Sequence, residues 1–185
     1  MGISDFEKFV NSQQEANADE KFVWDNMRDE WLANLDLLYQ KVIDFLQEFV
    51  STGSINYEFS NVMLTEEHLG TYSAKRMNIK IGRQQVSLEP IGTLLIACKG
   101  RVDAIGSAGR AQILLINEKA NSPADLFKVT VTIGTGGKLP PPPPPAQTSQ
   151  PISWTWKIVT NEARKRFVDL DKESLFAVLM EVANA

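Results

Sequence analysis

The sequence contains little of the side-chain chemistry on which most catalytic and metal sites depend. Among 185 residues there is one histidine, His68, and one cysteine, Cys98. Structural zinc sites take about four protein ligands and catalytic ones about three, and a nucleophilic serine or cysteine usually has a histidine as its base. We therefore expect no catalytic residues, no metal site and no cofactor. We interpret His68 as part of a surface turn, and Cys98 as a small buried side chain.

Long apolar segments are also absent. Runs such as Leu94–Cys98 are far shorter than the ~20 residues of a membrane-spanning helix. The segment Met1–Val10 has neither the basic start nor the apolar stretch of a signal peptide. A single cysteine cannot form an internal disulfide. These absences predict a cytoplasmic protein that is not integral to a membrane.

The glycines form no phosphate-binding or nucleophile motif. Gly106–Gly109 lacks the Gly-x-Ser-x-Gly spacing of a nucleophile elbow. After Gly137 and Lys138, Leu139 occupies the position where a phosphate loop needs a hydroxyl group. We interpret Gly106–Gly109 as a turn between strands and the second segment as a linker. The sequence thus favours a non-enzymatic protein over an enzyme.

The length of the chain indicates one domain, and its charged residues are unevenly distributed along the sequence. A chain of 185 residues is near the usual size of a single domain, so residues 1–185 are taken as one. Residues 1–52 carry eleven acidic and four basic residues, a net charge of −7, and residues 53–185 a net charge of +3. This is not the strongly basic balance of a dedicated nucleic-acid-binding protein.

The first 52 residues read as helix. From Asp19 to Val50 there is no glycine or proline, and large apolar residues recur every seven positions, as Trp24, Trp31, Leu38 and Phe45. The apolar stripe is broad enough to lie across a sheet. A shorter helix is expected around Asp5–Glu15, with a bend or frayed join near Gln13–Ala18, and Gly53 supplies the stop.

Beyond Gly53 the apolar period changes to two, which is typical of half-buried strands. The following segments are expected to form strands: Ile55–Phe59, Met77–Ile81, Val86–Glu89, Thr93–Lys99, a strand ending near Ile105, Ala111–Ile116, Leu126–Ile133 and Ser153–Val159. Turns are expected at Gly92 and Gly100. The C-terminal part, 169–185, is expected to be helical, with Asp171 as its N-cap.

The sequence therefore predicts an α+β fold. A long N-terminal helix (1–52) packs on a curved antiparallel β-sheet (53–168), a meander of about six to eight strands. A C-terminal helix closes the structure. The sheet is expected to wrap the heptad-spaced residues of the long helix.

Residues 134–151 form the one low-complexity segment, with six successive prolines, Pro140–Pro145. Such a run favours an extended polyproline helix and forms a projecting loop. Lys138, Pro141 and Pro144 match a basic-x-x-Pro-x-x-Pro pattern, which aromatic-lined grooves of other proteins bind. The alternative interpretation is a rigid spacer.

A second candidate surface is basic. Alternation places Arg76 and Lys80 on one face of a strand, and Arg101 and Arg110 are expected to share that face on neighbouring strands. Such a face could bind an anion or an acidic partner, and nucleic acid is not excluded. An ordinary solvated sheet face is the alternative.

These observations predict a non-enzymatic interaction or accessory protein that acts through its proline loop and its acidic helix. A protein partner is expected, and a homo-oligomer through the long helix is possible. The alternative is a small-molecule binder or enzyme with a pocket between the long helix and the concave sheet face. Polar groups such as Tyr57, Glu58, Tyr72 or Asp103 would then have to point inward.

Overall fold

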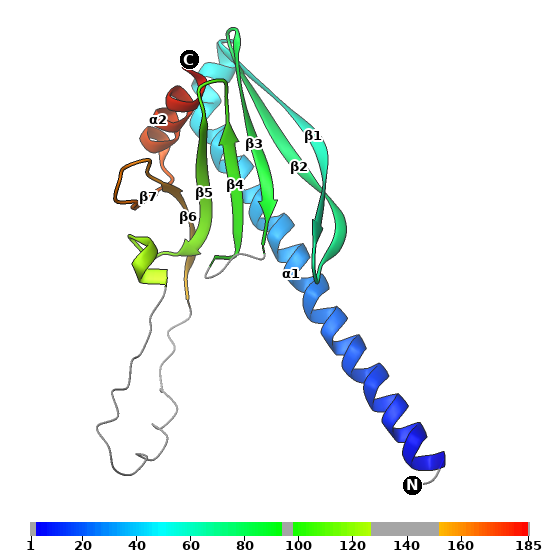
Figure 1. Cartoon of the computed structure of the whole chain (residues 1–185). Helices are drawn as coiled ribbons and strands as arrows, with labels where there is room; N and C mark the ends of the chain where they lie inside the picture. The colour runs from blue at the N-terminus through cyan, green and yellow to red at the C-terminus, as the bar shows by residue number, and fades with distance from the viewer. Residues whose placement is uncertain (1–2, 94–97, 127–151, 185) are drawn as a thin grey trace, which may run out of the picture.

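The computed structural model describes residues 3–93, 98–126 and 152–184. It confirms the predicted α+β class: a long N-terminal helix, an antiparallel sheet and a C-terminal helix (Figure 1). The helices are α1 (Ile3–Ser51) and α2 (Lys172–Ala183), with a short 3-10 helix η1 (Pro123–Leu126). The strands are β1 (Ile55–Glu66), β2 (Gly70–Ile81), β3 (Gln84–Gly92), β4 (Gly100–Ile105), β5 (Arg110–Asn117), β6 (Trp154–Val159) and β7 (Phe167–Asp169).

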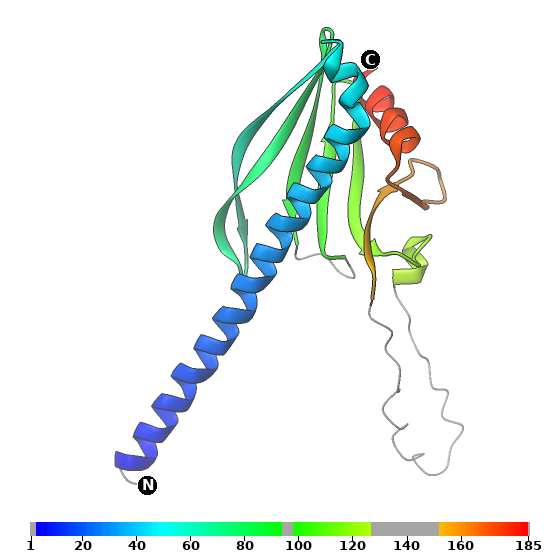
Figure 2. The same ribbon diagram turned by 180° about the vertical axis from the view of Figure 1, so that it is seen from behind.

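The seven strands lie in chain order from β1 to β7, and each pairs with its neighbour in antiparallel fashion. The sheet is open, with β1 at one edge and β7 at the other. Both helices lie against the same face of the sheet (Figures 1 and 2). We call this the inner face and the opposite side the outer face. Neither described helix combines the length and apolar character that a bilayer crossing requires.

Helix α1 runs without interruption for 49 residues. The bend predicted near Gln13–Ala18 is wrong, because no proline or glycine occurs between Ile3 and Ser51 to break the hydrogen-bond ladder. The predicted stop is confirmed. Gly53 has a φ of +73°, and its amide donates to the carbonyl of Val50 at 3.0 Å.

Among the described side chains of α1, those in the core lie in its C-terminal half. The buried side chains of α1 are Trp31, Leu35, Leu38, Tyr39, Val42 and Leu46. They recur every three or four residues, so they form one stripe that faces the sheet. Trp24 and Phe45, which the sequence also places on this side, are half-buried and pack at the margins of the core.

Strand alternation fills the inner face with apolar side chains. Along β3 and β4 these are Val86, Leu88, Val102 and Ala104, all fully buried. Leu175, Val178, Leu179 and Val182 of α2 join the same core. The predicted N-cap is confirmed, since the Asp171 carboxylate accepts a 2.8 Å hydrogen bond from the Ser174 amide.

The β1–β2 hairpin leaves the sheet halfway along its length. β2 pairs with β3 only over Met77–Ile81, whereas its pairing with β1 continues to Gly70. The buried side also changes parity, from Met77 and Ile79 to Ala74 and Tyr72. Two-stranded ribbons twist more strongly than larger sheets. The free part of the hairpin thus turns its other side toward α1.

Trp31 fills the space between α1 and the sheet. A Cβ added to Gly100 would lie 2.2 Å from Cζ3 of Trp31, so only glycine fits under the indole ring. The prediction of a turn at Gly100 is therefore wrong, because this glycine begins β4 and allows close packing. Of the strand predicted at Thr93–Lys99, only the ends are described: Cys98 forms a single bridge, and the Lys99 amide donates to the carbonyl of Leu115 at 2.8 Å. Thr93 lies in a bend, and Leu94–Ala97 fall outside the described residues.

The last strands show what the sequence pattern missed. β6 lies between β5 and the three-residue β7, a strand that was not predicted. The strand predicted at Leu126–Ile133 falls almost wholly outside the described residues, and Leu126 itself ends η1. A small second cluster, Ile116, Ala120, Val159 and Phe167, lies apart from the main core.

The packing of Trp31 on Gly100 gives a direct stability prediction. We expect Gly100→Ala to lower the free energy of unfolding by about 2 kcal/mol or more, because the new methyl group overlaps the indole ring. Gly109→Ala is the matched control, since a Cβ there would meet no atom within 4 Å. Urea denaturation of both variants tests this, and equal stability would refute the packing.

Candidate functional site

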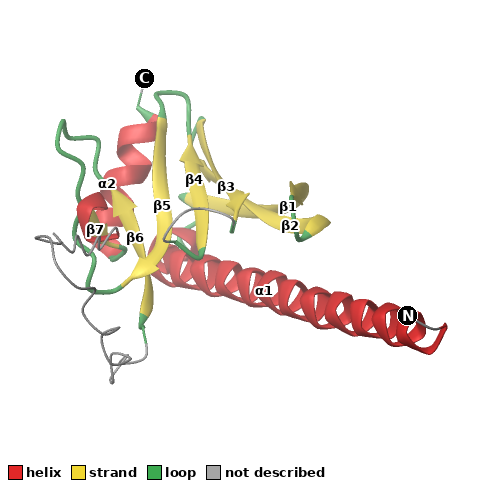
Figure 3. Ribbon diagram, turned by 60° about the horizontal axis from the view of Figure 1, so that its bottom comes forward, coloured by secondary structure: helices red, strands yellow, loops and turns green. Residues whose placement is uncertain are grey.

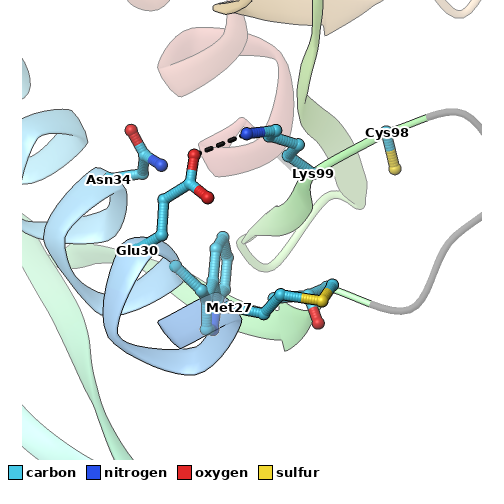
Figure 4. A pocket seen from close by; sticks show the side chains of 7 residues that line it. Met27, Glu30, Asn34, Cys98 and Lys99 are labelled. Atoms are coloured by element: carbon cyan, nitrogen blue, oxygen red, sulfur yellow. Dashed lines mark hydrogen bonds and ion pairs between the residues drawn. The ribbon is translucent and has the colours of Figure 1, made fainter. Parts of the chain in front are cut away.

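The described part of the chain contains a pocket between α1 and the connection of β3 to β4 (Figure 4). It has a volume of about 270 Å³. Its lining residues are Met27, Glu30, Trp31 and Asn34 from α1, with Thr93, Cys98 and Lys99 from the sheet side. At its rim the Lys99 Nζ donates to Glu30 Oε1 at 2.5 Å, which ties α1 to the start of β4 (Figure 4). This half-exposed ion pair closes one side of the pocket.

Behind the pocket, a carboxylate links the diverging hairpin to the rest of the sheet. Glu66, at the end of β1, accepts hydrogen bonds from the Thr93 amide at 2.8 Å and from the Thr93 hydroxyl at 3.0 Å. It also accepts one from the Tyr72 hydroxyl. The buried Trp31 Nε1–H has no hydrogen-bond partner among the described residues. The hydrogen bonds to Glu66 compensate for the missing strand pairs between β2 and β3.

The hydroxyl and thiol groups here are poorly suited to nucleophilic chemistry. Burial, reinforced by the hydrogen bond to Glu66, raises the pKa of Tyr72 far above its ordinary value. Burial also raises the pKa of the Cys98 thiol, so the thiol stays protonated at neutral pH. Within the described ranges, no group of three or more histidine, cysteine or acidic residues could hold a metal ion. The arrangement can hold a small, mostly apolar group.

The four polar residues predicted to point into a pocket do not line this one. Glu58 is exposed and forms an ion pair with Lys80, while Tyr57 is half-buried next to Phe59. Tyr72 is buried, and its hydroxyl donates to Glu66. Asp103 is completely buried, but on the outer face.

The strand register places all four predicted basic residues on the outer face, where each lies beside an acidic side chain. Lys80 Nζ is 3.2 Å from Glu58, and Arg76 Nη1 is 3.9 Å from Glu89. Arg101 and Arg110 share one carboxylate, described next. Lys157, on the same face, lies 3.1 Å from Asp169. The face is thus a mosaic of ion pairs rather than a continuous positive surface, which weakens its attraction for a polyanion.

Asp103 is the centre of this mosaic. Its carboxylate accepts two hydrogen bonds from Arg101, at 2.7 and 2.8 Å, and a third from Arg110 at 3.4 Å. The hydrogen bond to Asp103 raises the pKa of the Arg101 guanidinium. Asp103 thus engages the Arg101 guanidinium through both carboxylate oxygens. Arg110 has one longer contact, and its side chain is 60% exposed.

The N-terminal part of α1 is the other notable surface. We call Ile3–Val23 the arm. Figures 1 and 2 show that it projects beyond the sheet. Phe6 is 68% exposed, Phe22 67% and Val23 53%. The sequence did not identify these residues as an exposed surface, because a helical pattern does not show whether another element covers them.

Two other predicted features have different outcomes. His68 lies in the exposed β1–β2 turn, as expected, and its ring stacks on Trp24 at a centroid distance of 4.6 Å. The proline segment with Lys138, Pro141 and Pro144 lies outside the described residues.

In comparisons with known proteins, no family model, no curated protein and no solved structure matches this chain.

Because Asp103 is buried, we predict that a small change to its side chain strongly lowers the stability of the protein. We expect Asp103→Asn to lower the free energy of unfolding by about 3 kcal/mol, because it leaves two guanidinium groups without their carboxylate. The control is Glu58→Gln, which removes an exposed ion pair and should cost less than about 0.5 kcal/mol. Chemical denaturation measures both. Similar losses in the two variants would contradict the assigned role of Asp103.

Proposed function

We propose that this protein is a non-enzymatic interaction or accessory protein, and that the arm of α1 is its main binding element. The observation that carries the proposal is the exposure of Phe6, Phe22 and Val23 on a helix that continues past the sheet. The buried residues of α1 begin only at Trp31, after these three residues in sequence. Their side chains therefore contribute nothing to the core described above.

The energetics of helices support this proposal. An isolated helical segment of this length is marginal in water, and most helices in proteins are stabilised by packing of an apolar side. α1 has such packing only from Trp31 onward, with Trp24 at the margin. A partner that covers Phe22 and Val23 would supply the missing contacts. Aromatic side chains are also the commonest anchors of protein interfaces.

Charge indicates the kind of partner. Residues 5–30 carry eight acidic and three basic residues. Two such helices side by side would repel one another, which disfavours a homo-oligomer formed through α1. A different protein with a basic surface around an apolar groove fits this segment better, since complementary charge accelerates association and excludes wrong partners.

The other two functions considered from the sequence have less support. The pocket at Trp31 has a volume of about 270 Å³, slightly below the usual range for small-molecule sites, ~300–1,000 Å³. The charged groups at its rim, Lys99 and Glu30, form an ion pair with each other. On the outer face, every predicted basic residue lies beside a carboxylate. Neither surface presents unsatisfied groups that converge on a ligand.

Site-specific crosslinking tests the arm. We expect a photoreactive amino acid at position 22 to yield one discrete adduct with a protein in the cell of origin. The same group at position 37 should yield none, although Leu37 is 66% exposed on the same helix. Phe22→Glu should abolish partner binding without changing the thermal midpoint, because Phe22 contributes nothing to the core. Equal adducts at both positions, or binding that survives Phe22→Glu, would refute the proposal.

The proline loop is tested separately. Deletion of Pro140–Pro145 should leave the fold intact, because these residues lie between strands β5 and β6 in sequence and belong to neither. If the loop contributes to recognition, the deletion weakens recovery of the partner in a pull-down assay. Unchanged recovery would assign the loop a spacer role and leave the arm proposal standing.

A further inference from the structure

The two edges of the sheet are very different. One edge strand, β7, has three residues, whereas the other, β1, has twelve. Short edge strands offer little backbone for pairing with another chain. A long edge strand presents a row of unpaired N–H and C=O groups, which is a template for a further strand. β1 is therefore the edge at which the sheet can grow.

β1 also lacks the features that protect such edges. It contains no lysine, arginine or proline. Its pairing with β2 is continuous from Ile55 to Glu66, without a bulge that would twist the strand away. Among the described residues, the backbone of Asn56–Thr65 makes hydrogen bonds only within the β1–β2 ladder. Figure 3 shows α1 running beneath the hairpin and not paired with β1, which remains an edge strand of the sheet.

Two large apolar side chains accompany the open edge. Phe59 is 44% exposed and Met63 is 66% exposed. They are four residues apart, so they belong to the same alternating row of β1 side chains. The twist of the hairpin turns Phe59 toward the ring of Tyr39, at a centroid distance of 5.5 Å, and Met63 toward solvent. Asn61 lies midway between them.

From this arrangement we propose that β1 pairs with β1 of a second copy of this chain, antiparallel and centred on Asn61. A two-fold axis at this residue places Phe59 of each copy opposite Met63 of the other, giving two identical contacts. Pairs of methionine with an aromatic ring are favourable. The two open sheets become one continuous sheet of two copies.

The charges of β1 are compatible with this register. The charged side chains in the strand are the carboxylates of Glu58 and Glu66. Centred on Asn61, Glu58 lies opposite Leu64, and Glu66 lies opposite Asn56. No carboxylate faces another, which would destabilise the pair. A two-fold contact of this kind is closed, so it yields a dimer and not a fibre. This inference does not depend on the proposed function.

Sedimentation velocity of the full chain over a range of concentrations tests the dimer. We expect the wild type to dimerise and Met63→Lys to weaken dimerisation by about tenfold or more, because a lysine on an edge strand opposes pairing. The matched control is Met180→Lys, on α2, where the side chain is 59% exposed and away from β1. A monomeric wild type, or a Met63→Lys variant that dimerises like the wild type, overturns the inference.

A crosslink tests the register independently of stability. In a Cys98→Ser background, Asn61→Cys should form an intermolecular disulfide readily, because residues directly opposite in an antiparallel pair have Cα atoms about 4.5–5.5 Å apart. Asn161→Cys, exposed in the loop between β6 and β7, should not. A dimer that is lost on deletion of the arm but retained by Met63→Lys would place the interface on α1. Equal crosslinking at both positions would also overturn the inference.

Discussion

The packing of one indole ring against one glycine determines how the two layers of this protein meet. Trp31 projects from α1 onto Gly100 at the start of β4, and its ring also lies 6.2 Å from that of Trp156 on β6. The side chain thus fixes the separation of helix and sheet where β2 and β3 diverge. Glu66 then ties the diverging hairpin to Thr93. Without a large side chain in this place, the space between α1 and strands β4 and β6 would lose its filling.

This arrangement divides the molecule into parts with different roles. From Trp31 onward, α1 packs in the core. Before Trp24, its described side chains pack on no other element of the described chain. The outer face of the sheet is satisfied internally, because its arginine and lysine side chains lie beside carboxylates. Two surfaces of the described residues that lack internal partners are the apolar residues of the arm and the edge of β1. Both are suited to contacts between proteins.

The sequence predicted the fold class well, for physical reasons that can be named. Heptad-spaced apolar residues and the absence of glycine and proline defined α1, and period-two alternation defined strands such as β3 and β5. Gly100 was misread because a turn and a close contact both require glycine, and only the position of Trp31 distinguishes them. The pocket and the Glu66 contacts join residues distant in sequence, so no local pattern could reveal them. The basic side chains of the outer face were located correctly, but their acidic neighbours depend on strand order.

The central claim is that α1 has a packed half and a free arm. Native-state hydrogen exchange of the isolated chain tests it most directly, because exchange reports the local free energy of opening for each amide. The account predicts that amides of Leu35–Leu46 exchange at the rate set by global unfolding. Amides of Ile3–Val23 should exchange on the order of 100-fold faster or more. Equal protection along the whole helix in the isolated protein would contradict the account, because it would require the arm to be packed within the chain itself.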